Sequence, residues 1–153
     1  MELKERIVTF FSKEKIKKAL LYIVGFIVSM AIVLGVKGCL KNTNMPEEFK
    51  DAKKILREVG FSSIKYTNTE KDLYELFEIL EIDAVGVEEA LVGYNDSAEE
   101  MFIILRCDST LHANETEWEM VSLAVNSSDS YTVKKEYTFI YFGNKELVSK
   151  ILK

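Results

Sequence analysis

The chain has 153 residues and a formal net charge of −5, and this charge is divided unevenly along the sequence. Residues 1–41 carry eight Lys or Arg against three Glu, a net charge of +5, whereas residues 42–153 carry twelve against 22 Asp or Glu, a net charge of −10. Because nucleic-acid binding depends on cations that displace counterions from phosphates, the acidic part excludes nucleic acid as the main partner.

The most distinctive segment is ALLYIVGFIVSMAIVLGVKGCL, residues 19–40. Its first 18 residues carry no charge and would span about 27 Å as a helix, enough to cross a bilayer. A cleaved signal peptide has a shorter apolar core that ends in a small-x-small cleavage site, and the uncharged run here does not end in such a site before Lys37. The sequence therefore predicts a basic flank at 1–18, a transmembrane anchor at 19–40, a linker at 41–47 and one small folded domain at 48–153.

An alternative for this segment rests on VKGC, residues 36–39. This stretch is similar to the bacterial lipobox in having an aliphatic residue, a small glycine and then a cysteine. It departs from that pattern at Lys37, where the lipobox has a small or apolar residue. In this alternative the segment is a lipoprotein signal, and Cys39 carries the lipid.

The flanking cations predict how the anchor is oriented. Six Lys or Arg precede its uncharged part, residues 19–36, and three follow that part within 15 residues, so the N-terminus is expected in the cytoplasm and the domain outside. The basic flank should contact the membrane surface, because anionic headgroups attract it. It either only sets this topology or also forms an amphipathic helix, since Leu3, Ile7, Phe10 and Phe11 fall near one helical face.

The first half of the domain reads as helix, strand and helix. From Pro46 to Val59, apolar residues recur at helical spacing, and Gly60 marks the end of this helix. Residues 61–66 form a short candidate strand. Residues 70–82 are then the clearest helix of the chain, with Thr67 or Thr69 as its cap and Leu73, Leu76, Phe77 and Leu80 on its core face.

The second half begins with two β-rich runs, 85–94 and 101–108, joined by the polar turn NDSAEE. The second run is apolar on nearly both sides and should be central in a sheet. Residues 115–126 favour a helix, because Trp118, Val121 and Val125 suit helical spacing and Asn114 with Glu117 resembles a capping pair, although a strand stays an alternative. Residues 131–142 alternate as one long strand, and a terminal helix starts at Asn144.

This order predicts an α+β domain with a ferredoxin-like β-α-β-β-α-β core and flanking helices. Without the weak first strand, the order α-β-β-α-β is similar to the small ring-building modules that lie outside the membrane in bacterial secretion and sporulation assemblies. That resemblance is one of element order alone, with no sequence motif behind it, and it implies an assembly role by analogy.

The sequence contains little evidence for a catalytic or metal site. His112 is the single histidine, expected in a loop after Asp108, and closed metal sites need three or four ligands. Glu75, Glu78 and Glu81 should form a solvated helix face, and NDSAEE lacks the spacing of a calcium loop. No phosphate-binding glycine loop, nucleophile elbow, H-E-x-x-H or C-x-x-C occurs. We therefore expect no enzyme activity, no catalytic residue, no cofactor and no metal.

One aromatic set is a candidate binding face. In a single strand over 131–142, odd-numbered residues share one side, which would place Tyr131, Tyr137, Phe139 and Tyr141 together. Such a face either fills the core between sheet and helix or binds a glycan or peptide. Cys107, in the central strand, is expected to be a small buried core residue rather than the partner of Cys39 in a disulfide.

These observations lead to two functional hypotheses. The first is a single-pass, membrane-anchored protein whose extracytoplasmic domain is a protein-interaction or assembly module of a cell-envelope complex. Its partners would be the membrane and either other envelope proteins or further copies of itself. The alternative is a membrane-tethered glycan-binding or peptide-binding protein, or a lipoprotein, that uses the aromatic face.

Overall fold

The computed structural model describes residues 45–127 and 129–153. The expected anchor at 19–40, the basic flank and Cys39 lie outside these residues. Within the described part of the chain, no helix combines the length and the apolar character that crossing a bilayer requires.

The described residues form an α+β domain with one antiparallel sheet and four helices. In chain order the elements are α3 (Glu47–Glu58), β1 (Ser63–Thr67), α4 (Glu70–Leu80), β2 (Val87–Asn95), β3 (Glu100–Cys107), α5 (Thr110–Ser127), β4 (Tyr131–Glu136), β5 (Phe139–Asn144) and α6 (Lys145–Ile151). The strand order is β1-β2-β3-β5-β4, and every neighbouring pair is antiparallel. As predicted, β3 is the central strand.

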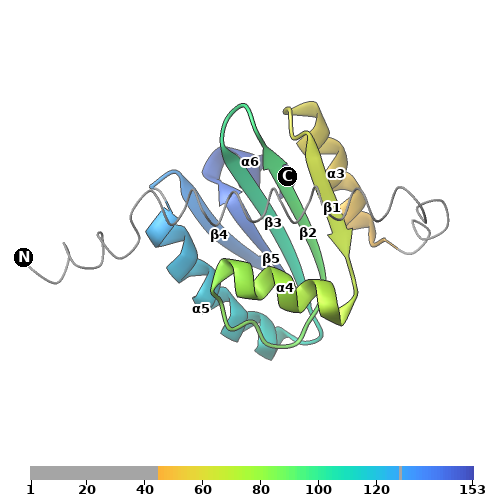
Figure 1. Cartoon of the computed structure of the whole chain (residues 1–153), viewed down its shortest axis with the longest axis vertical. Coiled ribbons are helices and arrows are strands. Elements are labelled where there is room, and N and C mark those ends of the chain that lie inside the picture. Colours follow the sequence, from red (N-terminus) through yellow and green to blue (C-terminus); the bar gives the residue numbers. More distant parts are fainter. Residues whose placement is uncertain (1–44, 128) are drawn as a thin grey trace, which may run out of the picture.

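The sheet is the middle of three layers, with α4 and α5 on one face and α3 and α6 on the other (Figure 1). Alternate residues of β3 enter the two sides: Ile103 and Leu105 pack under α4 and α5, whereas Phe102 and Ile104 pack under α3 and α6. This double burial explains why the strand is apolar on both sides.

The helices follow the predicted periodicity. α4 buries Leu73, Leu76 and Leu80, and the Thr69 side chain caps it by accepting a hydrogen bond from the Asp72 N–H. α6 begins after Asn144, whose side chain accepts from the Glu146 N–H. The ambiguous segment 115–126 is helical, which confirms the preferred alternative.

Two local predictions near α5 are wrong. The helix starts at Thr110, so Asn114 and Glu117 lie inside it and do not cap it; both instead contact the Lys135 ammonium. His112 lies in the first turn of α5 rather than in a loop.

The single long strand over 131–142 is also wrong, because this segment is the hairpin of β4 and β5. Glu136 pairs with Phe139, and the chain turns at Tyr137, whose φ of 54° is left-handed. Paired residues point to the same side of a sheet, so an even-numbered residue of β4 shares a side with an odd-numbered residue of β5. The alternation of a single strand is therefore inverted after the turn.

The ferredoxin-like topology is found in only one half of the sheet. β3, α5 and β4 form a split β-α-β unit, because β3 and β4 are both antiparallel to β5, which lies between them. In the other half, β1 and β2 are direct antiparallel neighbours although α4 connects them. A ferredoxin-like sheet would place another strand between these two.

Candidate interaction surface

Helix α5 has apolar residues on two opposite sides. Its sheet-facing side buries small and medium residues, Ala113, Thr116, Met120 and Ala124. Its outer side carries three residues that are 63%, 75% and 77% exposed, namely Leu111, Trp118 and Val125, with Val121 beside them. We call these four exposed residues the α5 stripe.

The α5 stripe runs along the helix. Leu111, Trp118 and Val125 recur every seven residues, which is nearly two full turns of the helix. The direction of each side chain around the helix axis therefore differs by only about 20° from that of the previous one. From Leu111 to Val125 the stripe is about 21 Å long at 1.5 Å per residue. Scattered exposed apolar residues are ordinary, but an aligned set that includes a tryptophan has the composition of an interface.

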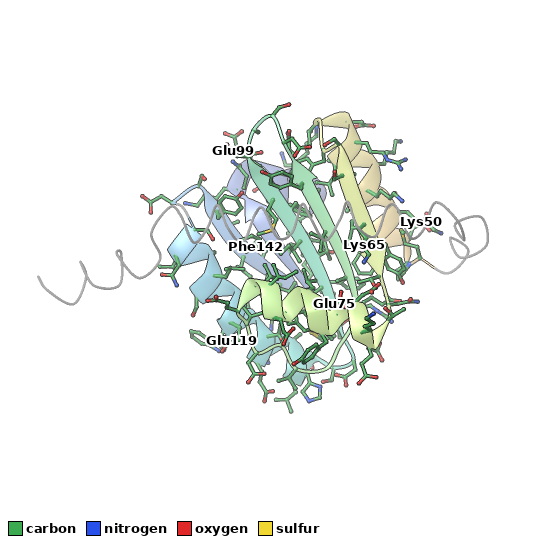
Figure 2. All side chains as sticks on the ribbon, in the orientation of Figure 1. Lys50, Lys65, Glu75, Glu99, Glu119 and Phe142 are labelled. Atoms are coloured by element: carbon green, nitrogen blue, oxygen red, sulfur yellow. The ribbon has the colours of Figure 1, made fainter. Side chains whose placement is uncertain are left out.

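One flank of the stripe is acidic. Residues 110–127 contain Glu115, Glu117 and Glu119 but no Lys or Arg. Glu119 lies on the outer side of the domain at α5 (Figure 2). Glu117 is 3.7 Å from the Lys135 Nζ, which leaves Glu115 and Glu119 as the two carboxylates of α5 without an ion pair among the described residues. At about 100° per residue, Glu115 and Glu119 fall on the same side of the stripe, so the surface is apolar along its centre and negative along one border.

The start of α5 is fixed by contacts with the segment before β2. The Thr116 hydroxyl accepts from the Val85 N–H at 3.1 Å and donates to the Val85 carbonyl at 3.2 Å. The Asp108 N–H donates to the Gly86 carbonyl at 2.8 Å, and the His112 Nδ1 lies 2.6 Å from the Asp108 carboxylate. This hydrogen bond lowers the pKa of Asp108. The single histidine thus contacts the residues just before its own helix.

The four aromatic residues of the predicted binding face are not brought together. Tyr131 packs under α4 and α5, 5.2 Å from the Phe142 ring, and its hydroxyl accepts from the Met101 N–H. Phe139 and Tyr141 belong to the opposite side, under α3 and α6. Tyr137 is 86% exposed at the hairpin turn. The inverted alternation of the hairpin is the reason for this separation.

The remaining predictions concern the carboxylates of α4, metal ligands and Cys107. Glu75 is 3.8 Å from Lys71 on the surface of α4. In the described part of the chain, no group of three or more His, Cys, Asp or Glu side chains could hold a metal ion. Cys107 is buried, and this burial raises the pKa of its thiol to about 11.

One polar cluster was missed from the sequence. The Glu89 carboxylate, largely buried, accepts from the Tyr66 hydroxyl at 2.8 Å and lies 2.8 Å from the Arg106 Nε, while Glu88 is 3.0 Å from the same guanidinium. The contact between Glu89 and the Arg106 Nε is an ion pair without hydrogen-bond geometry. The sequence signal was Arg106 near the end of one apolar strand and the adjacent Glu88 and Glu89 near the start of the other, and the structure pairs Glu89 with Arg106 in the sheet.

Comparison of the chain with protein-family models, curated protein sequences and solved structures gives no match.

Proposed function

We propose that the protein is a single-pass membrane protein with a cytoplasmic N-terminus, and that its acidic domain is an extracytoplasmic interaction or assembly module of a cell-envelope complex. The apolar segment at 19–40 and its flanking cations support the location. The α5 stripe supports the interaction, and it is the observation on which the proposal depends.

The α5 stripe is not needed to hold the helix on the sheet. Met120 and Thr116 are fully buried on the opposite side, so polar residues at positions 111, 118 and 125 would leave the core unchanged. Tryptophan is among the residues that contribute most to protein interfaces, because it buries a large area at a low entropic cost. A partner that covers the stripe explains three apolar residues in one line along an exposed helix.

The charge of the domain favours a different protein as the partner. A second copy would bring two domains of −10 together with acidic borders in contact, and like charges at an interface oppose association. The complementary surface is an apolar groove bordered by Lys or Arg. The tether then raises the effective concentration of the domain for partners in the same membrane.

The glycan-binding or peptide-binding alternative is not retained. It required Tyr131, Tyr137, Phe139 and Tyr141 on one exposed face, and these residues lie in three different surroundings.

The proposal is tested by photocrosslinking of the full chain in its native membrane. A photoreactive amino acid replaces Ser122, an exposed residue beside the α5 stripe; the matched control replaces Ser149, which is also exposed and lies on α6. Both serines donate a hydrogen bond to the carbonyl four residues earlier, so the two replacements disturb similar contacts.

We expect one defined adduct from position 122, none of that size from position 149, and loss of the adduct when Trp118→Glu is added. An adduct with the mass of two chains would show that the partner is a second copy. Absence of any specific adduct at position 122 would contradict the proposed interaction.

A further inference from the structure

Helix α3 carries four cations on one side in an otherwise acidic domain. Lys50, Lys53, Lys54 and Arg57 follow the spacing i, i+3, i+4 and i+7, which places them along one side of the helix. They are four of the twelve cations in residues 42–153. We call this group the α3 basic stripe.

The charges of the α3 basic stripe are largely unneutralised. Lys50 is 3.3 Å from Glu47, whereas Lys53, Lys54 and Arg57 have no ion pair among the described residues. Partial burial and the neighbouring Arg57 charge lower the pKa of Lys53. Cations four residues apart on a helix repel each other, so an anion bound along this side would relieve that repulsion.

The shape around the stripe is open. The four cations line a shallow groove of about 420 Å³ together with Met45 and Glu58. Such an open groove suits a surface of many phosphates better than a single enclosed phosphate, which would need cations converging on one point.

The stripe lies close along the chain to the predicted membrane anchor. The apolar segment ends at Leu40 and α3 begins at Glu47, so seven residue steps separate them. A fully extended chain covers about 24 Å in that distance, and α3 itself is about 18 Å long. The tether therefore keeps the stripe within reach of the headgroup layer.

We propose that the α3 basic stripe binds the phosphates of anionic lipid headgroups and so orients the domain on the membrane. This proposal rests on the proposed function in one respect, the anchor at 19–40. Each cation near an anionic surface strengthens binding by about fivefold. With α3 against the bilayer, α5 lies on the far side of the sheet and the α5 stripe faces away from the lipid; Lys50 and Glu119 lie at opposite sides of the domain (Figure 2).

The test uses Trp118, which is the single tryptophan of the chain, as a fluorescence donor. The full chain is reconstituted in vesicles of phosphatidylcholine, with or without phosphatidylglycerol, that contain a lipid with a dansyl acceptor on its headgroup. Docking of α3 holds Trp118 away from the headgroups, so we expect lower energy transfer in the anionic vesicles than in the neutral ones. High salt should remove this difference.

The variant Lys50→Glu with Lys54→Glu should abolish the difference between the two lipid mixtures. The control, Lys71→Glu with Lys134→Glu, changes the net charge equally at exposed positions outside the stripe and should keep the difference. Circular dichroism checks that both variants remain folded. Equal energy transfer in both mixtures for the unchanged chain, or loss of the difference in the control as well, would overturn the proposal.

Two further measurements separate the remaining outcomes. If inorganic phosphate abolishes the difference and sodium chloride of the same ionic strength does not, the site takes soluble phosphate and the assignment to lipid is wrong. If an alkaline carbonate wash releases the chain from neutral vesicles, the anchor itself is refuted. A chain that stays embedded without any dependence on lipid charge refutes the orientation alone.

Discussion

Truncation of Trp118 tests whether this residue belongs to an interface or to the core. In Trp118→Ala the helix keeps its buried side, Ala113, Thr116, Met120 and Ala124, so the fold should not change. The partner, in contrast, loses the largest side chain of the α5 stripe. We therefore expect a large effect on binding and a negligible effect on stability.

The size of the effect follows from the exposed area. A tryptophan side chain can bury about 150 to 250 Å², and Trp118 is 75% exposed in the isolated chain, which leaves about 150 Å² for a partner to cover. At about 25 cal/mol per Å² this area corresponds to about 4 kcal/mol, of which alanine retains a part. We expect a loss of about 2 to 3 kcal/mol in binding free energy, or about 30-fold to 150-fold in Kd. The free energy of unfolding should change by less than about 0.5 kcal/mol.

The assay is a titration of the full chain with the partner captured through position 122, together with urea unfolding of each variant. Val59→Ala is the control, because Val59 is a partly exposed apolar residue at the end of α3, on the other face of the sheet. Its Kd should equal that of the unchanged chain. An unchanged Kd for Trp118→Ala, or a fall in its urea midpoint typical of a core substitution, would refute the reasoning.

Three further predictions concern the core. Burial is the main reason that the pKa values of Tyr66 and Tyr141 are raised to about 12. Their contribution to stability is therefore complete below about pH 10, the pKa of tyrosine in the unfolded chain, and is lost as the pH rises through about 12. The urea midpoint should fall over this pH range and should fall less in Tyr66→Phe, and a midpoint independent of pH would contradict the prediction. Gly143→Ala would place a Cβ 2.5 Å from the Cδ2 of the fully buried Phe102 ring. This variant should lower the free energy of unfolding by about 1 to 3 kcal/mol, measured by urea unfolding. A stability equal to that of the unchanged chain would exclude this contact. Cys107 should resist thiol reagents in a Cys39→Ser variant until urea is added, because burial raises the thiol pKa to about 11; rapid labelling of the folded variant would count against its burial.

The elements that the sequence predicts correctly are those whose apolar residues recur with one clear period. The helix over 70–82 and the central strand near 101–108 agree with α4 and β3, since each shows a clear period of 3.6 or 2. The hairpin of β4 and β5 was missed because its turn, Tyr137 and Thr138, lacks the glycine or asparagine that normally adopts a left-handed φ. Alternating residues then continued across the turn and resembled one strand.

The α5 stripe was missed for a related reason. Trp118, Val121 and Val125 indicate a helix but not which side of it meets the sheet. The buried side consists of smaller residues, with Ala113, Thr116 and Ala124 among them, so hydrophobicity alone points to the wrong side. Only the packing of Met120 against the sheet shows that the tryptophan faces outward. The strand order was equally hidden, because no local signal places β5 between β3 and β4.

Two separate hydrophobic clusters lie on the two sides of the sheet, so the packing on one side does not depend directly on the packing on the other. Side chains of adjacent strand residues, such as Ile103 and Ile104, enter different clusters and do not share partners. Substitutions that share no partner usually have additive effects on stability. The outer surface of α5 can therefore change in sequence while α3 and α6 keep theirs, and a designer could vary the two sides as separate modules of one scaffold.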